Sequence, residues 1–298
     1  SCLCYLQVKF MNQLNLFVSL TRLKKPIGYM LLFWPCIWGL TLVYDFSEEL
    51  DVYLFYSILF FLGSVLMRSA GCIVNDILDK NFDKKVSRTK DRPIASGKIS
   101  TTLGLGYAFI LCLLAFIILI NFNYFTIFLA LASMPLAFTY PLMKRYTYWP
   151  QLFLGITFNY GLILGWTSIQ GQLDIVPIIF YFGAIFWTLG YDTIYGYQDI
   201  KDDEIIGLKS TSIKFKGNPK IFLTICYLTL VFAFALGGYL MNFNKIYFLF
   251  LLFPLFHLFQ YQIKSFKLDD PSVCLKLFKS NNFLGLIIFV NILIGKIS

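Results

Sequence analysis

Long apolar runs dominate this 298-residue sequence and constrain its fold more than any other feature. A helix that spans a bilayer needs about 20 apolar residues. Nine runs come close to this length, and the fourth and fifth are the weakest because Pro135 and Gly155 interrupt them. The runs cover approximately 26–44, 53–74, 103–121, 123–140, 151–168, 175–194, 220–241, 244–263 and 281–296. We therefore predict an all-α, polytopic membrane protein with nine transmembrane helices.

The composition agrees with a membrane protein. Hydrophobic residues make up 58% of the chain and charged residues only 14%, whereas about 25% of the residues in soluble domains are charged. The seven cysteines form no CxxC pair, and the single histidine, His257, has no second histidine with which to share a metal. We therefore expect neither a disulfide framework nor a zinc site.

The basic residues are distributed unevenly between the two sides of the predicted bundle. With the N-terminus inside, only Lys245 and Lys296 of the 25 Lys and Arg residues fall on the outer side, and Arg68 lies within the second run. Basic loops favour the inner side of a membrane. The net charge of +9 therefore orients the protein, and we expect no nucleic-acid partner. The inner side would be the cytoplasm for a bacterial inner membrane or the matrix for a mitochondrial inner membrane.

Two clusters of acids follow the second and sixth apolar runs. The first stretch reads NDILDKNFDKK (75–85), and the second reads YDTIYGYQDIKDDE (191–204). Residues three, four and seven positions apart share one face of a helix. We therefore expect each cluster to lie on one side of its helix end. The first comprises Asn75, Asp76, Asp79 and Asp83, and the second comprises Asp192, Tyr195, Asp199 and Asp202.

Carboxylates gathered in this way repel one another, so a cation usually lies between them. Mg²⁺ prefers carboxylate and phosphate oxygens as ligands, and bases beside such a metal favour a phosphate-rich anion. Bases do follow the clusters: Arg88, Arg92 and Lys98 after the first, Lys209 and Lys214 after the second, and Lys144 and Arg145 after the fourth run. The sequence predicts a magnesium–diphosphate site at the inner edge of the membrane. The alternative is that the acids are solvated loop residues.

These segments resemble the UbiA superfamily of intramembrane prenyltransferases. NDILDKNFD has the N-D-x-x-D-x-x-x-D form of the first aspartate motif, DTIYGYQDIKDD resembles the second, and RTKDRPIASGKIS resembles the segment after the first. The segments KPIGYMLLFWPCIWGL, MRSAGCIVND, YPLMKRYTYWPQ and GLKSTSIKF are similar to the subgroup that prenylates 4-hydroxybenzoate in ubiquinone biosynthesis. The resemblance covers about residues 20–220.

The resemblance implies one domain over residues 1–298, in which helices surround a central cavity and residues 1–20 lie outside the bundle. A polyprenyl diphosphate would enter from the membrane lipid, and its tail would leave through a lateral opening. The two aspartate motifs would face each other across the inner mouth of the cavity. No protein partner is implied.

The resemblance also implies a Mg²⁺-dependent reaction, in which a polyprenyl group passes from polyprenyl diphosphate to the ring carbon ortho to the hydroxyl of 4-hydroxybenzoate. The catalytic residues would then be Asp76, Asp79, Asp83, Asp192 and Asp199, which would bind the metal ions together with Asn75 and Asp202. The diphosphate would be bound by Arg88, Lys209, Arg145 and Lys144. Arg68, Arg22 or Arg145 would hold the acceptor carboxylate. Tyr195 would face the allylic cation, because aromatic faces attract positive charge.

Four alternatives stay open. The first is a non-catalytic scaffold of the same fold, against which the intact aspartates argue. Arg68 could form an internal ion pair with Asp76 or Asp79 instead of binding an acceptor. A sister prenyltransferase could use a naphthoate, haem, homogentisate or a chlorophyllide as its acceptor. An ion-coupled transporter would place its acids near the bilayer midplane on broken helices, whereas both clusters here lie at one edge of the membrane.

Overall fold

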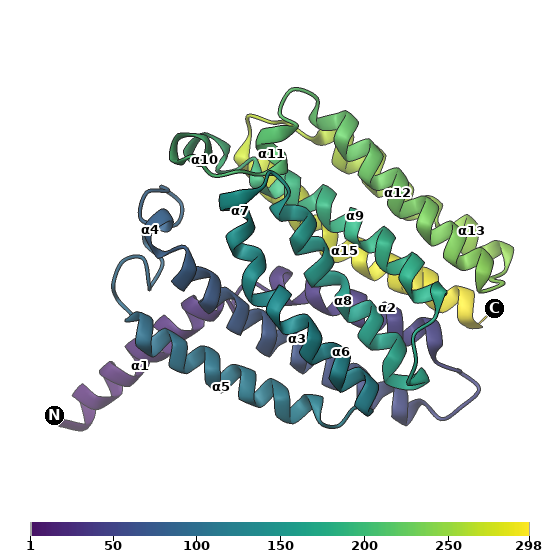
Figure 1. Cartoon of the computed structure of the whole chain (residues 1–298), viewed down its shortest axis with the longest axis horizontal. Helices are drawn as coiled ribbons and strands as arrows, with labels where there is room; N and C mark the ends of the chain where they lie inside the picture. The colour runs from purple at the N-terminus through teal and green to yellow at the C-terminus, as the bar shows by residue number, and fades with distance from the viewer. Residues whose placement is uncertain (1, 298) are drawn as a thin grey trace.

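The computed structural model describes the backbone of residues 2–297 and the side chains of residues 11–297, and this part of the chain forms helices and no strand (Figure 1). The all-α prediction is confirmed. The longer helices are α1 (Cys2–Thr21), α2 (Ile27–Val43), α3 (Leu50–Leu78), α5 (Thr101–Leu119), α6 (Tyr124–Thr139), α8 (Pro150–Gln170), α9 (Ile175–Gly196), α12 (Pro219–Leu240) and α15 (Pro271–Ile297). The shorter ones are α4 (Lys80–Asp83), η1 (Tyr140–Leu142), α7 (Met143–Tyr146), α10 (Ile200–Ile206), α11 (Thr211–Lys214), α13 (Lys245–Phe250), α14 (Leu252–Phe256) and the π-helix η2 (His257–Ile263).

The helices confirm an integral membrane protein. Within residues 2–297, eight helical stretches are long and apolar enough to cross a membrane. These are Leu50–Leu78, Thr101–Leu119, Tyr124–Tyr146, Pro150–Gln170, Ile175–Gly196, Pro219–Leu240, Lys245–Ile263 and Pro271–Ile297. The first expected span corresponds to α2, which has 17 residues and is shorter than the usual span. The set of nine full-length spans is therefore not confirmed.

Two details of the predicted spans need correction. The helix α15 begins at Pro271 and not near residue 281, because Cys274 and Leu277 are buried in the core even though lysines alternate with them. Pro135 and Gly155 do not interrupt their helices. A Cβ atom added at Gly155 would lie 2.8 Å from a backbone oxygen of α9, so this glycine permits the close approach of α8 and α9.

The backbone of α2 lies directly against that of α8. A Cβ atom added at Gly39 would lie 2.0 Å from the carbonyl oxygen of Leu162, and one added at Gly165 would lie 2.2 Å from the carbonyl oxygen of Cys36. Small residues allow membrane helices to approach this closely. The glycines thereby fix α2 within the bundle although it is short.

A buried chain of hydrogen bonds connects the helices of the second half. Trp187 Nε1 donates to Asn281 Oδ1 at 2.8 Å, and Gln262 Nε2 donates to the same oxygen at 2.9 Å. Tyr227 OH donates to Gln262 Oε1 at 2.6 Å. Polar groups inside a membrane must find partners within the protein. This network therefore ties α9, α12, η2 and α15 together.

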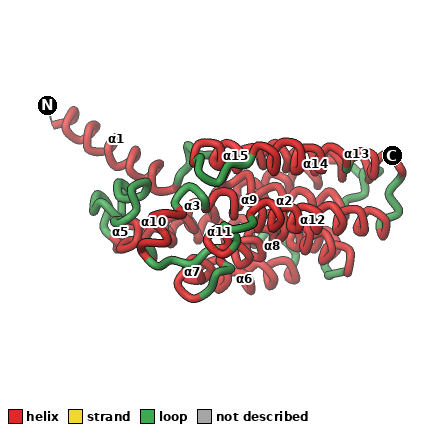
Figure 2. Tube along the Cα trace, turned by 90° about the horizontal axis from the view of Figure 1, so that it is seen from above, coloured by secondary structure: helices red, strands yellow, loops and turns green. Residues whose placement is uncertain are grey.

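Two long loops leave the bundle at the same end, which we call the loop end. Residues 79–100 follow α3 and contain α4, and residues 197–218 follow α9 and contain α10 and α11. Figure 1 shows α4 and α10 at this end, away from the C-terminus. In Figure 2 the helix α1 projects from the same side of the molecule, and its last turn is anchored because Leu20 is fully buried in a cluster with Ala70 and Ile73 of α3.

Candidate active site

The two long loops contact each other at the loop end. Arg88 donates from Nε to both carboxylate oxygens of Asp199, at 2.8 and 3.0 Å, and from Nη1 to the hydroxyl of Tyr195 at 3.0 Å. Ser87 donates from its backbone N and from Oγ to Asp202 Oδ2, at 3.2 and 3.0 Å. The second acidic cluster therefore lies against the segment that follows the first.

Two aspartates of the first cluster share one arginine. Asp76 accepts hydrogen bonds from Arg22 Nη2 at 2.5 Å and from Arg92 Nη1 at 3.1 Å. The same atom of Arg92 donates to Asp83 Oδ2 at 2.9 Å. Both carboxylates are buried, and the side chain of Asp76 is only 2% exposed. The alternative of solvated loop acids is therefore wrong for this cluster.

Asp79 ends the helix instead of continuing it, because α3 stops at Leu78 and Asp79 is its C-cap. Its backbone N donates to the carbonyl oxygen of Asn75, a half-buried residue in the last turn of α3. The Asp79 carboxylate accepts from Lys144 Nζ at 2.5 Å and lies 3.6 Å from Arg145 Nη2. The sequence pattern did not predict this break in the helix. The aspartates on both sides of the break are nevertheless buried.

The second cluster is not one continuous helix face. The helix α9 ends at Gly196, so the chain turns before Asp199 and Asp202. Asp192 remains inside α9, and no ion pair within 4 Å includes it in the described part of the chain. The expected alignment of Asp192 with the other two aspartates is therefore wrong.

The remaining predicted diphosphate ligands lie next to the first cluster. Arg145 Nη2 donates to the carbonyl oxygen of Leu78 at 2.6 Å. Lys209 Nζ donates to the carbonyl oxygen of Tyr146 at 3.2 Å, and its backbone N donates to that of Lys144 at 2.8 Å. The backbone of Lys209 is thereby tied to α7, whose Lys144 contacts Asp79.

The residues predicted to bind the acceptor or to face the allylic cation, Arg68, Arg22 and Tyr195, have different environments. Arg68 lies 5.2 Å from the centre of the Phe158 ring, and within residues 11–297 no ion pair joins it to Asp76 or Asp79. Arg22 is engaged by Asp76, and its backbone has the left-handed φ of 57°, which is uncommon for a residue other than glycine. Tyr195 bonds Arg88 through its hydroxyl and packs 4.4 Å from the ring of Phe278, measured between centroids.

An apolar cavity of about 430 Å³ extends into the bundle from Arg68 and Tyr140. Residues of α2, α3, α5, α6 and α8 line it, and they include Gly63, Met67 and Phe116. Its lining is mostly apolar, with a few polar groups such as Arg68, Ser64 and Tyr140, which suits an apolar chain attached to a charged head group.

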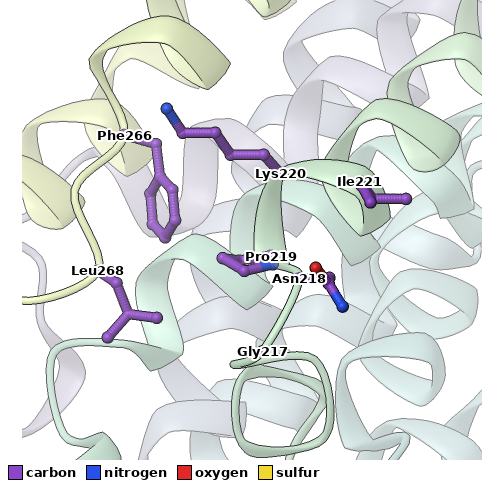
Figure 3. A pocket seen from close by; sticks show the side chains of 7 residues that line it. All are labelled: Gly217, Asn218, Pro219, Lys220, Ile221, Phe266 and Leu268. Atoms are coloured by element: carbon purple, nitrogen blue, oxygen red, sulfur yellow. The ribbon is translucent and has the colours of Figure 1, made fainter.

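A second hollow, of about 310 Å³, lies at the start of α12 (Figure 3). Its lining contains a single charged side chain, Lys220, and no acid. The lining residues are Gly217, Asn218, Pro219, Lys220, Ile221, Phe266 and Leu268. It contributes nothing to the acidic clusters.

The donor groups at the loop end fit Mg²⁺. All are oxygens, and Asp79 Oδ1 is buried with no hydrogen-bond partner, so it has a lone pair free for an ion. No group of three His, Cys, Asp or Glu side chains in the described chain is ready to hold a metal by itself. This agrees with Mg²⁺ chemistry, because the ion is commonly bound by one or two carboxylates together with substrate phosphates.

From the sequence, Arg92 is only one of the bases that follow the first cluster, and Asp203 has no predicted role. Arg92 links Asp76 and Asp83, and the signal that could have identified it is its place in the RTKDRP segment after the first cluster. Burial, together with the charge of Asp199, raises the pKa of Asp203 to about 6. Its position within KDDE resembles a solvated charge run, so the sequence gives no signal for this burial.

Comparison with known sequences identifies relatives over nearly the whole chain. Residues 32–289 match the model of the UbiA prenyltransferase family. The mitochondrial 4-hydroxybenzoate polyprenyltransferase of Bos taurus is 44% identical over 282 residues, which are 94% of this chain and 75% of the bovine protein. The 4-hydroxybenzoate geranyltransferase 2 of Lithospermum erythrorhizon is 39% identical, and the match covers 98% of this chain and 94% of that protein.

Solved structures share the fold. A UbiA homologue from Aeropyrum pernix K1 in its apo form superposes with a TM-score of 0.74 at 21% identity and covers 90% of this chain and 97% of its own. A UbiA homologue from Archaeoglobus fulgidus bound to GPP and Mg²⁺ gives a TM-score of 0.67 at 16% identity and covers 93% and 99%. Together with the family match over most of its length, these findings show that the chain belongs to the UbiA prenyltransferase family.

Proposed function

We propose that this protein transfers a polyprenyl group from polyprenyl diphosphate to the ring carbon ortho to the hydroxyl of 4-hydroxybenzoate, in ubiquinone biosynthesis. One observation carries the proposal: buried aspartates, each beside a base, lie at the C-terminal end of α3, and Arg68 and Gly71 of the same helix line an apolar cavity. The names of relatives at 44% and 39% identity support this acceptor. We also propose that the whole chain forms one prenyltransferase domain.

The acids at the loop end would hold Mg²⁺ with the diphosphate of the donor. The proposed ligands are Asn75, Asp76, Asp79, Asp83, Asp192, Asp199 and Asp202. When bound, Mg²⁺ supplies Lewis acidity that neutralises the leaving diphosphate. A UbiA homologue with both GPP and Mg²⁺ bound supports this choice of metal.

The bases have a second task in this proposal. Lys144 and Arg145 lie at Asp79, and Arg88 bonds Asp199. When a diphosphate binds, these side chains would turn from carboxylate to phosphate oxygens, and Lys209 would join them. Bases that already stand beside the site bind the anion without a large rearrangement, and fixed charges at the leaving group stabilise the transition state.

Arg68 is the best candidate for the acceptor carboxylate. Its guanidinium lines the cavity, and the alternative ion pairs with Asp76 and Asp79 are not formed, because these acids have other partners. Arg22 is less available, since it already bonds Asp76. Tyr195 stays a candidate for facing the allylic cation through its ring. A proton then leaves the attacked ring carbon to restore its aromaticity.

The location follows from the helices and from the relatives. The protein is an integral membrane protein, and relatives named as mitochondrial support a mitochondrial membrane. We propose the inner membrane with the loop end on the matrix side, because basic loops favour the inner side of a membrane. An ion-coupled transporter is disfavoured, because the acids gather at the ends of α3 and α9 and not at mid-membrane breaks.

The experiment is a competition between acceptors. Membranes that contain the protein receive labelled polyprenyl diphosphate, Mg²⁺ and one of 4-hydroxybenzoate, a naphthoate or homogentisate. We expect prenylated product only when 4-hydroxybenzoate is the acceptor, and at least about a hundredfold less of it from membranes that carry Asp79→Asn. If another acceptor is preferred, that compound replaces 4-hydroxybenzoate as the proposed substrate. The assignment of the chain to the UbiA prenyltransferase family would not change.

A further inference from the structure

The cavity follows one face of α3, and two glycines of this face line it. Gly63, Met67 and Gly71 lie four residues apart, so they share a helix face, and all three line the cavity. A Cβ atom added at Gly63 or Gly71 would meet no atom within 4 Å. These two positions therefore face empty space. A larger side chain there would extend into the cavity, and its Cβ atom would not clash with neighbouring atoms.

The two glycines stand at different depths from the aspartates. At 1.5 Å per residue, Gly71 lies about 8 Å and Gly63 about 20 Å along α3 from the level of Asp76. An extended chain of single bonds advances about 1.2 Å per bond, so one five-carbon prenyl unit spans about 5 Å. A donor with two units therefore passes Gly71 and ends before Gly63, whereas a donor with more than about four units extends beyond Gly63.

The cavity is closed at its far end and thin at its side. Phe122 packs against Phe60 and Tyr56, with ring centroids 4.9 and 5.1 Å apart. Phe116 of α5 and Leu131 of α6 line the cavity and are 43% and 46% exposed, so the wall that they form is the least covered. A long tail would therefore leave sideways between α5 and α6.

The side opening lies near the depth of Gly63. The helix α5 runs antiparallel to α3, since Gly104 faces Ile73 and Ile77 while Phe122 contacts Phe60. Phe116 therefore falls close to the level of Gly63. We therefore expect a tail that leaves between α5 and α6 to run beside this glycine.

We propose that Gly63 determines which donor lengths the protein accepts. The empty space at Gly63 admits tails of more than about four prenyl units, and Gly71 is passed by every donor. This inference rests on the proposed function and deepens it, because the relatives include both a polyprenyltransferase and a geranyltransferase at similar identity.

The test compares two donors in three variants. Gly63→Phe, Gly71→Phe and the control Gly106→Phe are assayed with 4-hydroxybenzoate, Mg²⁺ and either geranyl diphosphate or a nine-unit prenyl diphosphate. Gly106 is exposed on α5, lies outside the cavity and also has no atom within 4 Å of an added Cβ. We expect Gly63→Phe to lower kcat/KM for the long donor by more than about tenfold and to change that for geranyl diphosphate by less than about threefold, since steric exclusion discriminates by such factors.

The other variants complete the pattern. Gly71→Phe should lower transfer from both donors, and Gly106→Phe from neither. Gly63→Leu gives a smaller obstruction and should produce a weaker loss with the long donor. Equal losses for both donors in Gly63→Phe, or no loss for the long donor, would overturn the inference.

A binding measurement separates this inference from the proposed function. Each donor that binds the folded protein raises its Tm, and this needs no acceptor. In the purified Gly63→Phe protein with Mg²⁺, geranyl diphosphate should still raise Tm while the nine-unit donor should not. If wild-type protein binds both donors but prenylates no 4-hydroxybenzoate, the proposed acceptor fails and the length inference stands. If the nine-unit donor raises Tm equally in wild type and Gly63→Phe, the length inference fails.

Discussion

Arg88 donates two hydrogen bonds from Nε to the carboxylate of Asp199, at 2.8 and 3.0 Å, and thereby joins the loop after α3 to the segment after α9. The same pattern recurs in the first cluster, where Arg22 and Arg92 bond Asp76. Each acidic motif is thus neutralised by bases from another part of the chain. A diphosphate and its metal would replace these contacts with equivalent ones at little structural cost.

Substitution of Arg88 should weaken donor binding. Arg88→Ala removes a guanidinium that would bond phosphate oxygens, and a hydrogen bond to a charged group contributes about 1.5–3 kcal/mol. We expect the KM for polyprenyl diphosphate to rise roughly tenfold or more, while the KM for 4-hydroxybenzoate changes little. Ser87→Ala is the matched control, because it removes only the side-chain bond to Asp202. If both variants behave alike, Arg88 serves only to connect the loops.

Loss of a single carboxylate should abolish most turnover without unfolding the protein. Asp79→Asn keeps the size of the side chain and removes the charge beside Lys144, whose side chain is 26% exposed and can be hydrated. Lost neutralisation of the leaving group should cost several kcal/mol, or roughly 10²–10⁴ in kcat. Gel filtration and kcat measured on the same preparation check this. A variant that keeps more than about a tenth of wild-type activity would remove Asp79 from the proposed site.

Arg68→Ala should separate the acceptor from the donor. If Arg68 holds the carboxylate of 4-hydroxybenzoate equally in the ground and transition states, its loss raises the KM for this substrate and spares kcat. The KM for the donor should stay near that of wild type. Both Michaelis constants are measured in Arg68→Ala and Asp79→Asn membranes. The same pattern in the two variants would argue against separate roles.

Gly39→Ala tests the packing that holds α2 in place. Its Cβ would lie 2.0 Å from the carbonyl oxygen of Leu162. This oxygen belongs to the backbone, so the clash can be relieved only if α2 and α8 move apart. We expect a destabilisation of more than about 2 kcal/mol, seen as a lower Tm in detergent. In the control Gly106→Ala, the added Cβ atom meets no atom within 4 Å, and alanine is a better helix former than glycine. The Tm of this variant should therefore be unchanged or slightly higher. Similar Tm values for the two variants would contradict the close contact of α2 and α8.

The sequence was sufficient for the helical class and for most spans, because hydrophobic length depends on local composition. It failed where tertiary packing decides. The start of α15 is set by the burial of Cys274 and Leu277 between lysines. The sequence placed α2 to within one residue at each end, but it did not show that glycine contacts hold this short helix in the bundle. Neither effect is visible in a window of residues.

The acids of the site were predictable because they follow apolar runs in a recurring pattern. Their partners were not. The bond from Arg22 to Asp76 joins residues far apart in sequence, and the link from Lys144 to Asp79 depends on how α7 is placed over α3. Helical spacing also misplaced Asp192 relative to Asp199, because the chain turns after Gly196.

The structure of the product tests the central claim most directly. Purified protein is incubated with polyprenyl diphosphate, 4-hydroxybenzoate and Mg²⁺, with a parallel sample in EDTA, and the product is analysed by mass spectrometry and NMR. We predict a new carbon–carbon bond at the ring position ortho to the hydroxyl, formed with Mg²⁺ and absent in EDTA, because the buried aspartates need a divalent ion to hold diphosphate. A prenyl ether at the hydroxyl, or undiminished product in EDTA, would contradict the account.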